Sequence, residues 1–356
     1  MTRAAAAQRG RGSPLALAVT MGEPAGIGGE ILLKAWAARE GAGLPPFFAI
    51  DDPDRLRQES ARLNQGLEIA VIEHPKEAPE VFSRALPVLP LSLPMPVAPG
   101  KPDAGNAATV LTSLRRAVGL AREGLAKGVV TSPIHKKVLY TAGFRHPGHT
   151  EYLAELLDAR GPAVMMLVCP GLRVVPVTVH LALKRAIEAL TEDAIVHAGS
   201  VTHEALHRDF GIERPRLAVA GLNPHAGESG SLGREEIEIV EPAIAQLRAL
   251  GIDAVGPAPA DTLFHEKARG RYDAALCLYH DQALIPLKTI DFDHGVNVTL
   301  GLPIVRTSPD HGTALDIAGQ GIASPSSLMA AISLAGEMAE RRATSAVAPA
   351  AQSRLA

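Results

Sequence analysis

The sequence predicts an α/β protein in which mainly parallel strands form the middle of a three-layer α/β/α arrangement. Short apolar runs of strand length alternate with longer segments of helical periodicity along most of the chain. Several of these runs end in polar residues, as expected where parallel strands deliver loops to one edge of a sheet. At 356 residues the chain is too long for one hydrophobic core. We therefore expect two such domains.

The composition argues against several classes of partner. A net charge of -3 offers no basic surface to nucleic acid or anionic lipid, and 3% aromatic residues give few platforms for base stacking. No apolar run is long enough to span a membrane. Cys169 and Cys277 both fall in apolar, strand-like runs, which predicts buried thiols and a reducing compartment. We expect a cytoplasmic protein that binds neither nucleic acid nor membranes.

The N-terminal half alternates strands and helices. Residues 1–14 are rich in Ala and Arg without an apolar core, which predicts a mobile tail and no signal peptide. A strand at 15–19 leads into a glycine-rich turn at 21–30, which either brings backbone amides close to a ligand or only closes a tight turn. A helix follows the turn and extends to residue 38. We then predict strands at 47–50, 67–72 and 128–131, a proline-rich crossing at 86–103, and a helix at 106–123.

The C-terminal half continues the alternation. We predict strands at 163–168, 174–179, 217–222, 274–279 and 295–302, and helices at 152–157, 191–208, 235–250 and 326–342. Residues 343–356 are dominated by Ala, Pro and Ser and predict a second mobile tail.

Three histidines follow apolar runs in this half. His180, His225 and His280 each come directly after a predicted strand and are accompanied by polar residues or glycine. Neutral imidazole is the commonest nitrogen ligand for zinc and similar ions, so the three could converge on one divalent metal. Taken singly, each is more often a surface or hydrogen-bonded residue. Their shared context favours a metal-dependent enzyme.

Two further groups carry polar side chains suited to an anionic ligand. His149 and Thr150 open a helix, where a side chain can cap free amides, contact a phosphate, or do both. Lys288, Asn297 and Arg306 recur at element ends and offer donors to a phosphate or carboxylate. The alternative for these three is a solvated surface.

Three motifs of the sequence resemble those of a known protein family. Gly-Leu-Asn-Pro-His-Ala-Gly-Glu at 221–228, Tyr-His-Asp-Gln at 279–282 and Asn-Val-Thr-Leu-Gly-Leu-Pro at 297–303 are similar to the 4-hydroxythreonine-4-phosphate dehydrogenase family of vitamin B6 biosynthesis. The likeness spans nearly everything between the two tails. Residues 308–319 also resemble the nucleotide loop of β-decarboxylating dehydrogenases.

The resemblance implies a fold like that of isocitrate and isopropylmalate dehydrogenases, with two three-layer α/β/α domains and a cleft between them. Residues 15–140 with 305–342 would form the first domain, and residues 141–304 would form the second, which carries the metal and substrate residues. It also implies a homodimer whose active sites lie at the subunit interface.

The resemblance implies a role for each site residue. The expected roles are metal binding for His180, His225 and His280; substrate binding for His149, Thr150, Lys288, Asn297 and Arg306; and cofactor binding for His311, Gly312, Thr313 and Asp316. The general base remains open among Asp281, Asp261 and Lys288.

The implied activity is oxidation of 4-phosphohydroxy-L-threonine with NAD or NADP, helped by one divalent ion: Zn, Mg or Co. The product is a β-keto acid that loses CO2 to give 3-amino-2-oxopropyl phosphate. Three alternatives remain at this stage. One is a dehydrogenase of a related four-carbon acid, erythronate or threonate 4-phosphate. The more remote ones are a zinc-dependent lyase without a nicotinamide and an acyl- or phosphate-binding protein of similar fold without redox activity.

Overall fold

The computed structural model describes residues 15–64, 66–146, 148–159 and 161–347. The tail predicted at residues 1–14 lies outside these residues. The chain divides into two compact units. The first contains the described residues up to Arg145 together with His311–Gly336, and the second contains His146–Asp310 and the described residues from Glu337 onward. Both are α/β, so the predicted class is confirmed.

The first unit is built on a parallel sheet in the strand order β3-β4-β2-β1-β5. Strands β1 and β2 are buried on both faces, which explains the continuous apolar runs that predicted them. Its elements are β1 (Leu17–Thr20), α1 (Gly28–Ala37), β2 (Phe47–Asp51), α2 (Pro53–Arg62), β3 (Ile69–Val71), η1 (Pro75–Glu77), α3 (Ala78–Val81), β4 (Leu86–Pro90), η2 (Ala104–Asn106), α4 (Ala107–Arg122), β5 (Val129–Val130), α5 (Lys136–Thr141) and the start of α12 (Ser326–Val347).

Strand β4 occupies the start of the predicted proline-rich crossing, where the sequence analysis did not predict a strand. Proline excludes a helix, but its fixed φ is compatible with extended backbone. Leu86 and Val88 are fully buried and pair with β3 and β2, respectively. Burial of these side chains therefore supports a strand despite the neighbouring prolines.

The second unit has a mixed sheet in the order β12-β11-β6-β7-β10-β8-β9. Strands β7, β10, β8 and β9 are parallel, whereas β12, β11, β6 and β7 pair antiparallel. Its elements are α6 (His149–Leu156), β6 (Val164–Cys169), β7 (Leu172–Pro176), α7 (Leu183–Glu188), α8 (Glu192–Arg208), β8 (Arg216–Ala220), η3 (Pro224–Gly230), η4 (Glu236–Val240), α9 (Glu241–Ala249), β9 (Asp253–Ala258), η5 (Ala260–Thr262), α10 (Glu266–Arg269), β10 (Ala274–Cys277), α11 (His280–Ile290), β11 (Val296–Leu300) and β12 (Arg306–Pro309).

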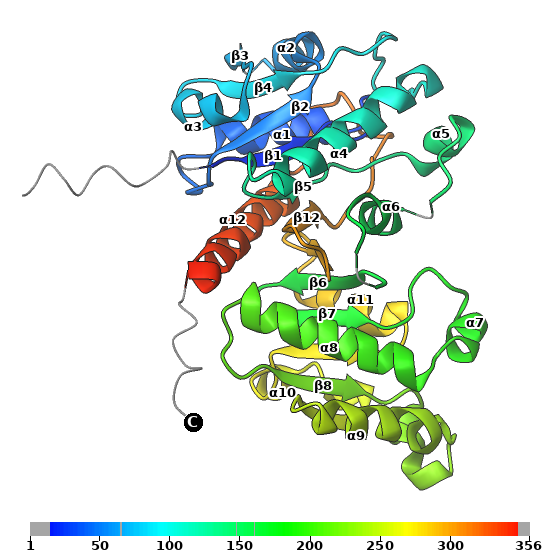
Figure 1. Cartoon of the computed structure of the whole chain (residues 1–356). Coiled ribbons are helices and arrows are strands. Elements are labelled where there is room, and N and C mark those ends of the chain that lie inside the picture. Colours follow the sequence, from blue (N-terminus) through cyan, green and yellow to red (C-terminus); the bar gives the residue numbers. More distant parts are fainter. Residues whose placement is uncertain (1–14, 65, 147, 160, 348–356) are drawn as a thin grey trace, which may run out of the picture. The chain divides into compact units, whose positions relative to one another are not determined.

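Helices cover both faces of this second sheet (Figure 1). Ala283 and Leu287 of α11 join a buried cluster with Cys277 of β10. On the opposite face, Gly199 of α8 approaches Leu276 so closely that an added Cβ would lie 3.3 Å from its Cδ1. Leu276 and Cys277, which are neighbours in β10, thus pack against helices on opposite faces of the sheet. Side chains along a strand alternate between the two faces in this way.

Two helix boundaries differ from the predictions. Helix α12 continues to Val347, so the predicted tail from 343 begins too early. The alanines in that stretch favour helix and allow the extension. The helix expected at 235–250 begins as a π-helical turn, η4, before α9. Within the part of the chain that the structure describes, no helix has the length and apolar character needed to cross a membrane.

Candidate active site

His180 and His280 lie side by side in the second unit. Strands β7 and β10 are parallel neighbours, and each histidine follows the carboxyl end of one of them. The ring centroids are 5.9 Å apart with an interplanar angle of 41°. Both rings line a pocket of about 220 Å³ together with Asp281. Two imidazoles at this separation are a suitable donor pair for one divalent cation.

The orientation of His280 is set by the residue after it. Oδ1 of Asp281 lies 2.7 Å from Nδ1 of His280. A carboxylate accepts from an Nδ1–H group, and this leaves Nε2 with the lone pair that a metal requires. The pair therefore has the chemistry of an oriented metal ligand.

His225 follows the next parallel strand, β8, which pairs with β10 on its other side. The three histidines thus leave the same edge of the sheet from adjacent strands. Among the residues that the structure describes, however, no three His, Cys, Asp or Glu side chains are grouped closely enough to hold a metal. The structure brings His180 and His280 together and does not add His225 to that group.

The loop that carries His225 is a left-handed turn. Residues 225–229 all have positive φ, from 42° at Glu228 to 77° at Gly227. The buried carboxylate of Glu236 secures the start of the turn, because its Oε1 and Oε2 accept from N and Nδ2 of Asn223 at 2.7 and 2.9 Å. The position of His225 therefore depends on a strained segment and on one buried acid.

The three candidate bases have different surroundings. Asp281 contacts His280, as described above. Nζ of Lys288 lies 2.8 Å from Oδ2 of Asp310 and 5.1 Å from the ring centroid of Phe292. Asp261 lies in η5, beyond the carboxyl end of β9, and its side chain is exposed. All three belong to the second unit.

Asn297 and Arg306 share one face of the antiparallel pair β11–β12. Asn297 lies opposite Ser308, and side chains two apart on a strand point to the same face. Arg306 is only 2% exposed and donates from Nη1 to Oγ1 of Thr299 at 2.8 Å. Burial lowers the pKa of Arg306 to about 10. Oδ1 of Asn297 is buried and accepts no hydrogen bond from any described residue. The face therefore offers a buried cation beside an amide whose oxygen is unsatisfied.

His149 and Thr150 are the first residues of α6. Their side chains lie outside the part that the structure describes, so their predicted substrate contacts stay predictions.

In the first unit, the glycine-rich turn lies against the predicted cofactor segment. The amide of Ile27 donates to the carbonyl oxygen of Thr313 at 3.1 Å. A Cβ on Gly26 would lie 2.8 Å from that same oxygen, so only glycine allows the approach. The predicted cofactor residues His311, Gly312, Thr313 and Asp316 therefore belong to a segment that packs on the turn. Glycine backbone at a helix start is compatible with the binding of a dinucleotide phosphate.

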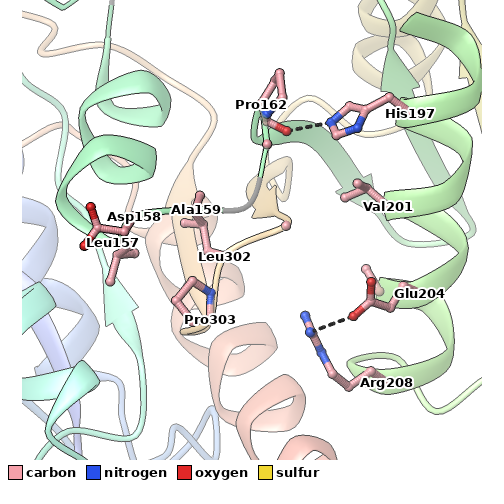
Figure 2. A pocket seen from close by; sticks show the side chains of 13 residues that line it. Leu157, Asp158, Ala159, Pro162, His197, Val201, Glu204, Arg208, Leu302 and Pro303 are labelled. Atoms are coloured by element: carbon pink, nitrogen blue, oxygen red, sulfur yellow. Dashed lines mark hydrogen bonds and ion pairs between the residues drawn. The ribbon is translucent and has the colours of Figure 1, made fainter. Parts of the chain in front are cut away.

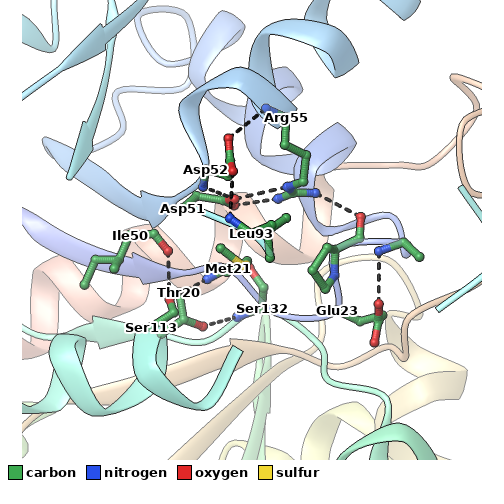
Figure 3. A network of polar contacts seen from close by, with 12 residues as sticks. Thr20, Met21, Glu23, Ile50, Asp51, Asp52, Arg55, Leu93, Ser113 and Ser132 are labelled. Carbon is green, nitrogen blue, oxygen red and sulfur yellow. Dashed lines mark hydrogen bonds and ion pairs between the residues drawn. The ribbon is translucent and has the colours of Figure 1, made fainter. Parts of the chain in front are cut away.

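A buried polar network holds this turn (Figure 3). Nη1 of Arg55 donates to the carbonyl oxygen of Pro24 at 3.0 Å, and its Nε donates to Oδ1 of Asp51 at 3.1 Å. Oγ of Ser113 accepts from the amide of Met21 at 2.9 Å. Both of the predicted roles of the glycines, closing a turn and presenting backbone to a ligand, are compatible with this arrangement.

Sequence reasoning missed several buried polar residues that are close to predicted ligands or belong to the glycine-rich turn. Thr178, Gln282 and Glu236 are all buried in the second unit and bond to backbone at strand ends. Glu23 is buried in the glycine-rich turn, and burial raises its pKa above the usual range. The sequence shows only that each of the four is a polar residue close to a predicted ligand or in the glycine-rich turn. Such positions are too common in a sequence to identify these four residues.

A larger pocket in the second unit contains none of the predicted site residues (Figure 2). Its volume is about 490 Å³, and one face of α8 lines it. Nε2 of His197 lies 2.7 Å from the carbonyl oxygen of Pro162, and Arg208 bonds to Glu204 at 3.2 Å. Because these polar groups already bind one another, we place the candidate chemistry at the His180–His280 pair.

The family model described as "Pyridoxal phosphate biosynthetic protein PdxA" matches residues 44–335. A Caulobacter vibrioides protein named 4-hydroxythreonine-4-phosphate dehydrogenase is 55% identical over 332 residues, covering 92% of this chain and 98% of the relative. A protein of the same name from Methylorubrum populi is 54% identical over 333 residues, covering 92% and 95%. The crystal structure of 4-hydroxythreonine-4-phosphate dehydrogenase from Klebsiella pneumoniae aligns with a TM-score of 0.83 at 41% identity, covering 92% of this chain and all of that one.

Proposed function

Because this chain belongs to the family of the pyridoxal phosphate biosynthetic protein PdxA, we propose that it is a 4-hydroxythreonine-4-phosphate dehydrogenase. The reaction is the oxidation of a secondary alcohol by NAD or NADP, with release of a proton. The resulting β-keto acid then loses CO2 to give 3-amino-2-oxopropyl phosphate. The observation that carries the proposal is 55% identity over 92% of the chain with a relative of that name.

We propose that His180, His225 and His280 together hold one divalent cation: Zn, Mg or Co. Three observations support this proposal. The rings of His180 and His280 are close together, and the carboxylate of Asp281 contacts Nδ1 of His280. All three histidines follow the carboxyl ends of adjacent parallel strands. A bound cation would supply the positive charge that acidifies the substrate hydroxyl and polarises the new ketone. His225 must leave its present place in the left-handed turn, or meet the other two histidines in an assembly of two chains. The proposed homodimer with shared sites would provide that assembly.

Lys288, Asn297 and Arg306 are proposed to bind the substrate phosphate, with His149 and Thr150. The buried guanidinium of Arg306 and the amide of Asn297 face one side of the β11–β12 pair, where they can act together. A guanidinium matches phosphate oxygens in geometry and charge. Lys288 can add a second positive charge if it exchanges its contact with Asp310 for the ligand.

The nicotinamide cofactor, which accepts the hydride when bound, is assigned to the first unit at His311, Gly312, Thr313 and Asp316. The packing of this segment on the glycine-rich turn supports the assignment. The base that removes the hydroxyl proton is one of Asp281, Asp261 and Lys288. Both aspartates are exposed, but Asp281 already contacts His280, and Lys288 already contacts Asp310.

The proposal is tested by a metal-replete assay that follows the absorbance of the reduced nicotinamide. We expect reduction of NAD with 4-phosphohydroxy-L-threonine, faster than with erythronate or threonate 4-phosphate, and loss of the signal after chelation. Cofactor reduction with a four-carbon analogue alone would assign the chain to a different substrate. Metal-dependent cleavage of the substrate without cofactor reduction would instead indicate a lyase.

A further inference from the structure

The three strand ends that carry the histidines are cross-linked by two buried side chains. We propose that Thr178 and Gln282 are positioning residues that set the spacing of the strand ends leading to His180, His225 and His280. The proposal rests on the metal site of the proposed function. It assigns a role to residues that contact neither substrate nor cation.

Thr178 links the residues that follow β7 to the residues that follow β10. The last backbone link between them runs from the amide of Val177 to the carbonyl oxygen of Cys277, at 2.7 Å. One residue further, Oγ1 of Thr178 donates to the carbonyl oxygen of Leu278 at 2.7 Å. Thr178 is 6% exposed, so water competes little for this bond. The side chain thus continues the pairing of the two strands toward His180 and His280.

Gln282 links the residues that follow β10 to the residues that follow β8. Its Oε1 accepts from the amide of Leu278 at 2.7 Å, and its Nε2 donates to the carbonyl oxygen of Gly221 at 2.7 Å. The carboxamide therefore takes the place of a peptide group between two strands whose backbone pairing has ended. Gln282 is also 6% exposed and shares the first turn of α11 with His280. One residue thus joins the start of the His280 helix to the strand that leads to His225.

Leu278 is the common point of both links. Thr178 binds its carbonyl oxygen and Gln282 binds its amide, so one peptide segment sets two of the three inter-strand distances. Metal ligands must be placed to within a fraction of an ångström, and loss of groups that orient them typically weakens metal binding about 10–100-fold. The same bonds also contribute to fold stability, so the test must separate the two effects.

The test uses the metal-free full-length protein and Co2+ alone, without substrate or nicotinamide. The dissociation constant and the ligand-field absorption of bound Co2+ are measured for the wild type and for Thr178→Val, Thr178→Ser and Gln282→Met. Thr178→Val keeps the shape and removes the hydroxyl, whereas Thr178→Ser keeps the donor. The matched control is Tyr272→Phe, which removes another buried hydroxyl bond to a carbonyl, that of Leu263 at 3.0 Å.

We expect Thr178→Val and Gln282→Met to weaken Co2+ binding about 10–100-fold and to change the absorption band. Thr178→Ser should restore both properties, and Tyr272→Phe should behave as the wild type at a comparable thermal midpoint. Wild-type affinity and spectrum in both Thr178→Val and Gln282→Met, with binding lost in His280→Ala, would overturn the positioning role alone. Wild-type Co2+ binding in His280→Ala would overturn the proposed metal site itself.

Discussion

At the scale of single residues, Asp281 shows how a contact changes the reading of a sequence motif. Next to a predicted metal ligand, its carboxylate is a reasonable general base. In the structure that carboxylate contacts Nδ1 of His280 at 2.7 Å. An acid in this position orients the ring and raises the basicity of its other nitrogen.

We predict that Asp281→Asn weakens binding of Co2+ about 10–100-fold, because a neutral amide orients and polarises the imidazole less well than a carboxylate. Isothermal titration of the metal-free protein measures this. The matched variant Asp261→Asn also removes an acid at the carboxyl edge of the second sheet, and it should bind Co2+ with wild-type affinity. If Asp281→Asn loses turnover with unchanged metal affinity, Asp281 is the base and does not serve to orient the ring.

At the scale of elements, the turn after β8 is held in place against its own backbone preference. Four of its residues other than glycine have positive φ, a conformation that L residues adopt at a cost of about 1 kcal/mol or more each. The contacts of Asn223 with Glu236 offset part of this cost. Strain of this kind is typical of segments that carry function.

Replacement of Gly227 by Ala tests how tightly this turn is packed. Gly227 has φ of 77°, and an added Cβ would lie 2.6 Å from Oε2 of Glu236. We expect the free energy of unfolding to fall by about 2–3 kcal/mol, from backbone strain together with displacement of the acid. Urea denaturation measures the change.

The control is Gly251→Ala, because Gly251 has φ of 81° with nothing within 4 Å of the added Cβ. It isolates the backbone cost, which we expect to be about 1 kcal/mol. Equal losses in the two variants would mean that the contact with Glu236 does not constrain the turn.

At the scale of the whole molecule, Asp209 joins segments that are far apart in sequence. Its buried carboxylate accepts from Nε and Nη2 of Arg342 in α12 at 2.5 and 2.9 Å. It also accepts from Nε and Nη2 of Arg208, the last residue of α8, at 2.8 and 3.0 Å. Burial alone would raise the pKa of Asp209, but the hydrogen bonds from Arg342 and Arg208 outweigh burial and lower it.

A lowered folded-state pKa fixes the direction of the pH dependence. The stabilisation is present above the unfolded-state pKa, near 4, and is lost as the pH falls through the lower folded-state value. Asp209→Asn should therefore reduce the free energy of unfolding by about 3 kcal/mol at pH 7, since it leaves two guanidinium groups without their carboxylate. The difference from the wild type should shrink below pH 4 in urea titrations. A difference that is constant from pH 7 to pH 3 would contradict this assignment.

The sequence by itself determined the α/β class, most strand and helix positions and the residues at the strand ends. These features depend on local periodicity and on the order of elements. Both are properties of the sequence itself and do not depend on how the chain folds. The family, too, could be identified from motifs such as Tyr-His-Asp-Gln at 279–282, and the comparisons confirm it.

Only the tertiary structure decided which side chains meet. It paired His180 with His280, kept His225 in a left-handed turn, and gave Asp281 and Lys288 partners of their own. It also placed β4 in a proline-rich stretch, where burial against two neighbouring strands outweighs local preference. Except for the contact between the neighbours His280 and Asp281, these outcomes depend on contacts between residues that are not adjacent in sequence. Periodicity along the chain contains no information about which side chains make such contacts.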